Sequence, residues 1–190
     1  MNTPAHAVFN LMVLGRKDHP EDLTPIAIGA VLPDLPMVFF YFVQKVILRT
    51  PEMVIWGDAY FQSGWQVFFD IFNSLPIIAI VGFLAWRFGS RWLTMLSLSM
   101  GLHALSDLPL HHDDAHRHFF PFSDWRFESP ISYWDPSHHG MWVGLAEIAM
   151  VIAGSVWLVR RYPYRWSKAL FALVAFSYIV YIAYVLVVWV

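Results

Sequence analysis

The sequence predicts an all-α, polytopic membrane protein: a bundle of about five spanning helices plus a short N-terminal helix, with a loop rich in histidine and aspartate between spans three and four. The 190 residues are 58% hydrophobic and only 14% charged, whereas soluble globular domains carry about 25% charged residues. The apolar residues form runs of roughly 20, which is the length needed to cross a hydrocarbon core. The chain is therefore predicted to be a single integral-membrane domain over residues 1–190.

Five segments have the length and composition of spanning helices, and the first of them is interrupted by two prolines at Pro33-Asp34-Leu35-Pro36. An apolar stretch before them, residues 3–14, is too short to span. It is predicted as a helix capped by Thr3 with Pro4 at its first position, lying either at the interface or inside the bundle. The predicted spans are residues 24–44, 66–86, 92–110, 141–159 and 169–189.

Basic residues are distributed unequally over the predicted loops. Because basic residues are enriched in cytoplasmic loops, the distribution predicts a cytoplasmic N-terminus and places the loop from Leu110 to Gly140 on the periplasmic or outer side. The N-terminal segment has no signal-peptide pattern and is expected to be retained. One set of loops holds Arg16, Lys17, Arg87, Arg91, Arg160, Arg161, Arg165 and Lys168, and the opposite set holds Lys45, Arg49, Arg117 and Arg126.

Histidine and aspartate gather in one part of the chain. Seven of the nine histidines and five of the ten aspartates lie between His103 and His139. Neutral imidazole and ionised carboxylate are preferred ligands of divalent metals, so the density of both predicts a metal centre at the edge of the membrane. The alternatives are a hydrogen-bonded pair inside the bundle for His103 and Asp107, and a solvated polar loop for the residues that follow.

The spacing of these residues selects candidate ligands. His103 and Asp107 are four residues apart, as are His112 and His116, so each pair would share one face of a helix. Three acids at membrane depth, Asp34, Asp70 and Asp107, are costly there unless they face a cavity or the bundle interior. The predicted metal ligands are His103, Asp107, His112 and His116, with Asp34, Asp70, His6 and His118 as further candidates; Asp113 and Asp114 are the candidate general bases.

Several neighbouring residues have two interpretations each. The aromatic run from Phe119 to Phe127 would anchor the loop at the interface or form a wall where lipid docks. Arg126 would bind a phosphate or pair with Glu128, and Asp135 would bind metal or cap the next helix. Glu147 is a candidate proton carrier, whereas His19 is expected at the surface.

Residue types and motifs that the sequence lacks exclude several catalytic mechanisms. The chain has no cysteine, which excludes thiolate ligands and a cysteine nucleophile, and it has no GxSxG, P-loop or GxGxxG motif. A net charge of −2 without a basic patch excludes the signature of nucleic-acid binding. A metal-activated water would then be the nucleophile, which favours hydrolysis of an ester or phosphoester in a lipid or lipid-linked substrate.

The order of the motifs resembles that of the YdjM-like family of membrane-bound metal-dependent hydrolases, which are inner-membrane proteins. The resemblance covers most of the chain and implies a helical membrane fold, a bound divalent metal and hydrolase activity. Where the family often has His-Ser-Leu, this chain has Asn73-Ser74-Leu75, so one ligand is lost or is replaced by Asp70. The matching motifs are His6, GAVLPD at residues 29–34, DIFNSL at residues 70–75, His103-xxx-Asp107 and Pro121-Phe122-Ser123.

Zinc is the expected metal because of its preference for imidazole, and manganese or iron would also suit mixed nitrogen and oxygen ligands. Membrane lipids are the expected partners, and the oligomeric state is left open. Two other functions agree with the same residues. One is a di-iron membrane oxidase or hydroxylase, because His112-xxx-His116 resembles a histidine box. The other is a metal-binding transporter or sensor without enzymatic activity.

Overall fold

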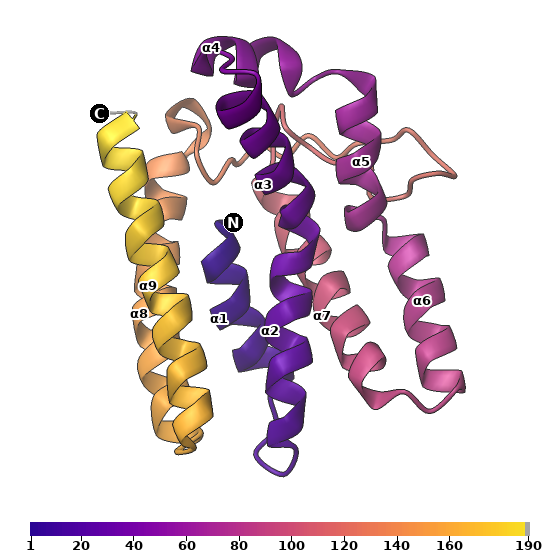
Figure 1. The fold of residues 1–190 in the computed structure, drawn as a ribbon, viewed down its shortest axis with the longest axis vertical. Coiled ribbons are helices and arrows are strands. Elements are labelled where there is room, and N and C mark those ends of the chain that lie inside the picture. The colour runs from indigo at the N-terminus through magenta and orange to yellow at the C-terminus, as the bar shows by residue number, and fades with distance from the viewer. Residues whose placement is uncertain (189–190) are drawn as a thin grey trace.

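The computed structural model shows an all-helical bundle (Figure 1). It describes the backbone of residues 1–188 and their side chains except at positions 166, 167, 170, 174, 181, 182 and 184–188. The principal helices are α1 (Thr3–Leu14), α2 (Leu23–Val31), α3 (Leu35–Phe42), α4 (Glu52–Val54), α5 (Ser63–Asn73), α6 (Leu75–Arg87), α7 (Arg91–Asp107), α8 (Gly140–Arg161) and α9 (Arg165–Val188).

Three helical stretches are long and apolar enough to cross a membrane: Pro20–Ile47, Ser63–Arg87 and Gly140–Arg161. They coincide with the predicted spans 24–44, 66–86 and 141–159. For the predicted span 92–110 the structure has α7, whose 17 residues make a helix of about 26 Å. The predicted span 169–189 falls in α9, and its last residue lies outside the described part of the chain. The total of about five spans is therefore not confirmed.

The first stretch is broken where the sequence predicts a break. Helix α2 ends at Val31, a 3-10 turn covers Leu32–Asp34, and α3 begins at Leu35. Proline has no backbone N–H and its ring collides with the preceding turn of an α-helix, so Pro33 and Pro36 are tolerated only at the starts of the turn and of α3. At the break, the carbonyl oxygen of Pro33 accepts a hydrogen bond from the side chain of Asn73 in α5.

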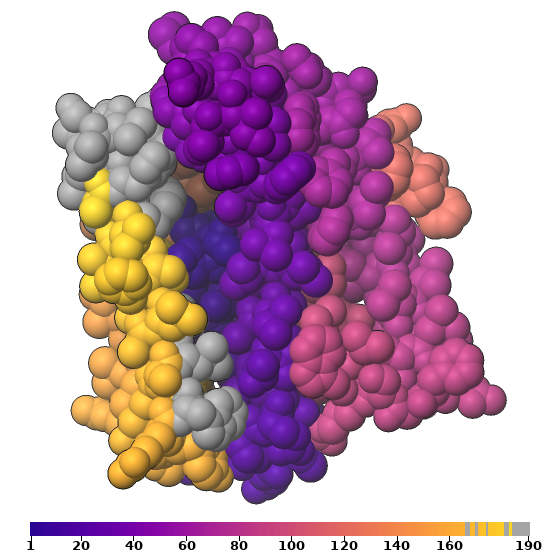
Figure 2. Space-filling view, in the orientation of Figure 1, coloured from indigo at the N-terminus to yellow at the C-terminus, as the bar shows by residue number. Residues whose placement is uncertain are grey.

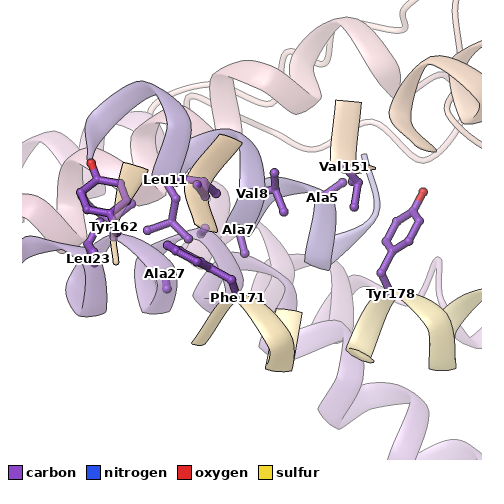
Figure 3. Packing of buried hydrophobic residues seen from close by; sticks show 13 residues of the cluster. Ala5, Ala7, Val8, Leu11, Leu23, Ala27, Val151, Tyr162, Phe171 and Tyr178 are labelled. Carbon is purple, nitrogen blue, oxygen red and sulfur yellow. The ribbon is translucent and has the colours of Figure 1, made fainter. Parts of the chain in front are cut away.

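Helix α1 occupies the middle of the bundle, between α2 and the pair formed by α8 and α9 (Figure 1). In the space-filling view it shows only as a small dark area between α9 and the α2–α3 stretch (Figure 2). Its residues Ala5, Val8 and Leu11 are almost completely buried. The main core cluster surrounds them, as Figure 3 shows, and includes Leu23, Ile26, Ala27, Ala30, Val151, Leu158, Tyr162 and Phe171.

The predicted cap of α1 is wrong. The N-cap position is Asn2, and Thr3 is the first helical residue. The Thr3 hydroxyl instead donates a hydrogen bond to Oδ2 of Asp34 at 2.5 Å, because α1 lies inside the bundle beside the break between α2 and α3. This contact joins the start of α1 to the first spanning stretch.

The outer faces of the bundle are apolar. Helix α6 exposes Ile80, Phe83 and Trp86, and α8 exposes Trp142 and Ile152. Exposed apolar surface of this extent is unfavourable in water but suits a hydrocarbon environment, where an apolar side chain on a helix surface has no cost. The arrangement agrees with a membrane protein.

The connections between helices divide between the two ends of the bundle. The α1–α2, α6–α7 and α8–α9 connections lie at the lower end in Figure 1, and the segments from α3 to α5 and from α7 to α8 lie at the upper end. The segment from α7 to α8 contains the loop rich in histidine and aspartate. Its first residues follow directly from the last turn of α7, which positions the candidate site.

Candidate metal centre

Three side chains from two helices form a buried group with the geometry of a metal site. His6 comes from α1, and His103 and Asp107 come from α7; all three are at most 2% exposed. Each offers one ligand atom, and these atoms lie within 4.8 Å of one another. The prediction that His103 and Asp107 share a helix face is confirmed, since Nε2 of His103 lies 3.3 Å from Oδ2 of Asp107.

Hydrogen bonds fix the orientation of both imidazole rings. Nδ1 of His103 lies 2.8 Å from the carbonyl oxygen of Ala30, which can only accept, so this nitrogen carries the proton. Ser106 donates its hydroxyl proton to the carbonyl oxygen of His103, and its oxygen then accepts from Nδ1 of His6 at 3.2 Å. A ring whose Nδ1 donates in this way presents a lone pair at Nε2 in its neutral form, as in metal-ligating histidines.

The two Nε2 atoms face carboxylate oxygens without forming hydrogen bonds to them. Nε2 of His6 lies 2.9 Å from Oδ1 of Asp107, and Nε2 of His103 lies 3.5 Å from Oδ1 of Asp34. Neither nitrogen has a hydrogen-bond partner, so the direction of approach is not that of a hydrogen bond. Ligands placed 2.0–2.2 Å from one ion lie about 3.0–3.6 Å apart, which is close to these separations.

The N-terminal ammonium of Met1 donates to Oδ1 of Asp107 at 2.5 Å, and a divalent cation at the centre would replace this ammonium as the partner of the carboxylate. Lone pairs on neutral imidazole and negative carboxylate oxygens repel each other at these distances when buried. The rings of His6 and His103 are stacked with centroids 3.7 Å apart, so protonating both rings would place two positive charges in contact. The donor set fits a divalent cation, which both imidazoles and both carboxylates would hold together.

The 3-10 turn after α2 contributes Asp34 to the centre. Its side chain is 16% exposed, and Thr3 holds its other oxygen by the hydrogen bond described above. The sequence places Asp34 beside two prolines and leaves open whether it reaches the site. The structure brings its carboxylate to the edge of the group formed by His6, His103 and Asp107.

Beyond α7, His111 continues the centre into the loop. Its Nε2 lies 3.4 Å from Oδ2 of Asp107, and its Nδ1 lies 2.9 Å from Oδ2 of Asp114. Burial would lower the pKa of His111, but the interactions with Asp107 and Asp114 together outweigh it and raise the pKa to about 9. His111 is one of the seven histidines between His103 and His139 but is not among the predicted ligands, although its spacing from Asp107 repeats that between His103 and Asp107.

His116 and His118 lie next to His111, and both are buried. The ring centroids of His116 and His111 are 5.5 Å apart, and those of His116 and His118 are 6.2 Å apart. Burial, together with the positive charge of His111, lowers the pKa of His116 to about 4. Burial also lowers the pKa of His118. Both rings are therefore neutral at pH 7 and keep a lone pair.

His112 is placed away from this group. Its ring stacks on His138 with centroids 3.8 Å apart, and its Nδ1 donates to the carbonyl oxygen of Ser129. The prediction that His112 and His116 share a helix face is wrong, because the chain leaves helical geometry after the 3-10 turn at Leu108–Leu110, which contains a proline. Asp113 is exposed, whereas Asp114 contacts His111; the general-base assignment of both stays a prediction.

Asp70 is bound by arginine. Its Oδ1 accepts the backbone N–H of Arg117 at 2.9 Å, and its Oδ2 accepts the guanidinium Nε at 2.5 Å. Nδ1 of His116 is 3.9 Å from Oδ1. Asp70 therefore fixes the loop that carries His116, and the structure does not bring it into the group formed by His6, His103 and Asp107.

Asp70→Asn is expected to loosen the loop, because it removes one partner of a buried ion pair, a change that costs about 3 kcal/mol. Thermal unfolding in detergent and amide hydrogen exchange over residues 111–126 would measure the effect. Asp124→Asn is the matched control. Asp124 also pairs with Arg117 but is 89% exposed, and surface ion pairs contribute at most about 1 kcal/mol. Equal effects of the two changes would contradict the anchoring role of Asp70.

Four further residues named in the sequence analysis, Asp135, Glu147, Arg126 and His19, make polar contacts outside the metal centre. Asp135 caps the 3-10 turn Pro136–His138, accepting hydrogen bonds from Ser137 and His138, whereas the N-cap residue of α8 itself is His139, which makes no side-chain cap bond. The bonds to Asp135, that from His138 first, lower its pKa to about 2. Glu147 accepts hydrogen bonds from Asn2 and Tyr178, and so ties α8 to α1 and α9.

Arg126 donates to Gln66 and to the carbonyl oxygen of Ala115. His19 is at the surface beside Glu21.

Comparison of the chain with known protein families, with curated proteins and with solved structures gives no match. The functional argument therefore depends on the residues of the centre and on their geometry.

Proposed function

We propose that this protein is a membrane-embedded, metal-dependent hydrolase that cleaves an ester or phosphoester in a lipid or lipid-linked substrate. The observation that carries the proposal is the buried group of His6, His103 and Asp107, whose ligand atoms lie within 4.8 Å of one another. Asp34 would supply a fourth ligand. The proposal also agrees with the resemblance of the sequence motifs to those of the YdjM-like membrane-bound hydrolases.

The ligand set determines which ions are suitable. Two imidazoles with two carboxylates suit zinc best, and manganese or iron is also acceptable to mixed nitrogen and oxygen ligands. A divalent cation in such a site supplies Lewis acidity and lowers the pKa of a coordinated water toward 7. The side chains of the protein would hold the ion in place, and one of them would accept a proton.

Asp114 is our candidate for the general base. Burial would raise the pKa of Asp114, but the close contact with His111, the positive charge of that ring and the hydrogen bond from Trp134 together outweigh this effect, so the pKa is lowered. The group is therefore ionised at neutral pH, as a proton acceptor must be. Trp134 donates its indole N–H to the same carboxylate at 3.2 Å and restricts its orientation. Asp113, exposed next to it, is the alternative base.

The surroundings of the centre favour a substrate from the membrane. Phe119, Phe122 and Trp125 lie on the exposed side of the loop, and aromatic side chains are enriched where a membrane meets water. We assign the protein to the bacterial inner membrane with this loop on the periplasmic side, because most basic residues belong to the connections at the opposite end of the bundle.

The proposal is tested by metal content and hydrolysis of the detergent-purified protein, isolated with a tag that contains no histidine. We expect at least one equivalent of zinc or manganese, together with hydrolysis of a chromogenic phosphodiester or a fluorescent phospholipid. Chelation should abolish hydrolysis, and the same ion should restore it. Folded protein without stoichiometric metal would overturn the proposal. Iron with oxygen-dependent turnover would favour the oxidase, and metal flux into liposomes without hydrolysis would favour the transporter.

A further inference from the structure

We propose that the loop after α7 forms a second divalent-cation site, built from His111, His116 and His118, with Asp107 as the carboxylate shared between the two sites. The inference rests on the proposed metal centre, because Asp107 belongs to both. It assigns a role to the three buried imidazoles of the loop that the first ion does not need.

The first support is the lack of partners for these rings. Both ring nitrogens of His111 and of His118, and Nδ1 of His116, are buried and have no hydrogen-bond partner among the described residues. A buried polar group without a partner costs about 1–3 kcal/mol, so the rings of His116 and His118 would destabilise the loop, whereas His111 is compensated in part by the charges of Asp107 and Asp114. A cation that displaces one proton from His111 and binds one nitrogen of each ring would remove most of this cost.

The separation of the rings is the second support. An imidazole nitrogen binds zinc at 2.0–2.1 Å, which places the ring centroid about 3.2 Å from the ion and neighbouring centroids about 5.2 Å apart in a tetrahedral site. The centroids of His111 and His116 are 5.5 Å apart, and those of His116 and His118 are 6.2 Å apart. Small rotations of the side chains would bring the three nitrogens to a common ion.

Asp107 joins the two sites. Its Oδ1 lies 2.9 Å from Nε2 of His6 and accepts a hydrogen bond from the N-terminal ammonium of Met1, which an ion there would displace. Its Oδ2 lies 3.3 Å from Nε2 of His103 and 3.4 Å from Nε2 of His111. A carboxylate with ligands on two sides can bridge two ions, which lie about 3.5–4 Å apart in two-metal hydrolytic sites. The arrangement gives one ion His6, His103 and Asp34, and gives the other the three loop histidines.

The contact of His111 with Asp114 has the form of a carboxylate supporting a metal ligand. Nδ1 of His111 lies 2.9 Å from Oδ2 of Asp114, although the angle falls short of a hydrogen bond. A slight rotation of the ring would let Nδ1 donate its proton to Asp114 while Nε2 binds the ion. Carboxylates in this position orient the ring and increase its basicity.

The test is metal stoichiometry. Wild-type protein, His116→Ala, His118→Ala and His103→Ala are stripped with chelator, reloaded with zinc, desalted and measured by mass spectrometry. We expect two equivalents in the wild type and one in each loop variant. His112→Ala is the matched control, because His112 lies in the same loop but stacks on His138; it should keep two equivalents. Manganese-loaded wild type should show exchange coupling by electron paramagnetic resonance, and His116→Ala should not.

The outcomes separate the two proposals. One equivalent in the wild type that His116→Ala and His118→Ala leave in place, but that His103→Ala removes, would overturn the second site and leave the first intact. Two equivalents without hydrolytic activity would support the second site and overturn the hydrolase. Thermal unfolding of each variant establishes that it is folded; if His116→Ala unfolds, His116→Gln, which retains a polar side chain of similar length, is measured in its place.

Discussion

His103→Ala is expected to abolish tight metal binding and to reduce hydrolysis to the background rate. The change removes one of the three ligand atoms that lie within 4.8 Å of one another. It also leaves the carbonyl oxygen of Ala30 without its donor. Loss of a direct ligand should exceed the 10–100-fold effect on affinity that is typical of removing a group hydrogen-bonded to a ligand, so we expect a fall of more than about 100-fold.

The measurement compares unfolding with and without metal. An ion that binds only the folded state stabilises it by about 2.7 kcal/mol at a concentration 100 times its dissociation constant. Zinc should therefore raise the unfolding temperature of the wild type and leave that of His103→Ala almost unchanged. His19→Ala, which replaces an exposed histidine paired with Glu21, should respond as the wild type does. A full response of His103→Ala to zinc would exclude His103 as a ligand.

Local patterns in the sequence predict the elements that depend on neighbouring residues. The break at Pro33 and Pro36 follows from the missing N–H of proline, and the pairing of His103 with Asp107 follows from their spacing on a helix. Both are confirmed. Hydropathy predicts three of the spans, but α7 is short for a span, and its last turn contributes Asp107 to the centre.

Tertiary contacts decide the parts that the sequence does not predict. His6 is isolated in the sequence, and only the burial of α1 between α2 and α8–α9 brings it against His103. Asp70 and Asp34 are both acids predicted to lie at membrane depth, yet one binds Arg117 and the other reaches the centre, depending on which element packs against each. For His112 and His116, four-residue spacing is misleading because the loop is not helical.

Substitution of Gly29 is also expected to have a large effect on stability, because α2 packs closely against α7 at this residue. A Cβ added at Gly29 would collide with the carbonyl oxygen of Leu96 and would lie 2.9 Å from Cβ of Ser99. These obstacles are backbone or the first side-chain carbon, so they cannot rotate away, and Gly29→Ala must push the helices apart. Overpacking of this kind costs about 1–3 kcal/mol.

The same displacement would reach the metal centre, because Ala30 follows Gly29 and its carbonyl oxygen orients His103 at 2.8 Å. Moving α2 away from α7 lengthens this hydrogen bond and separates Asp34 from His103. Gly29→Ala should therefore lower both the unfolding temperature and the zinc affinity, the latter by about 10-fold or more. Gly64→Ala is the control, since a Cβ there meets nothing within 4 Å and alanine favours a helix. If Gly29→Ala lost stability but bound zinc as tightly as Gly64→Ala, the contact between α2 and α7 would support the fold without positioning the ligands.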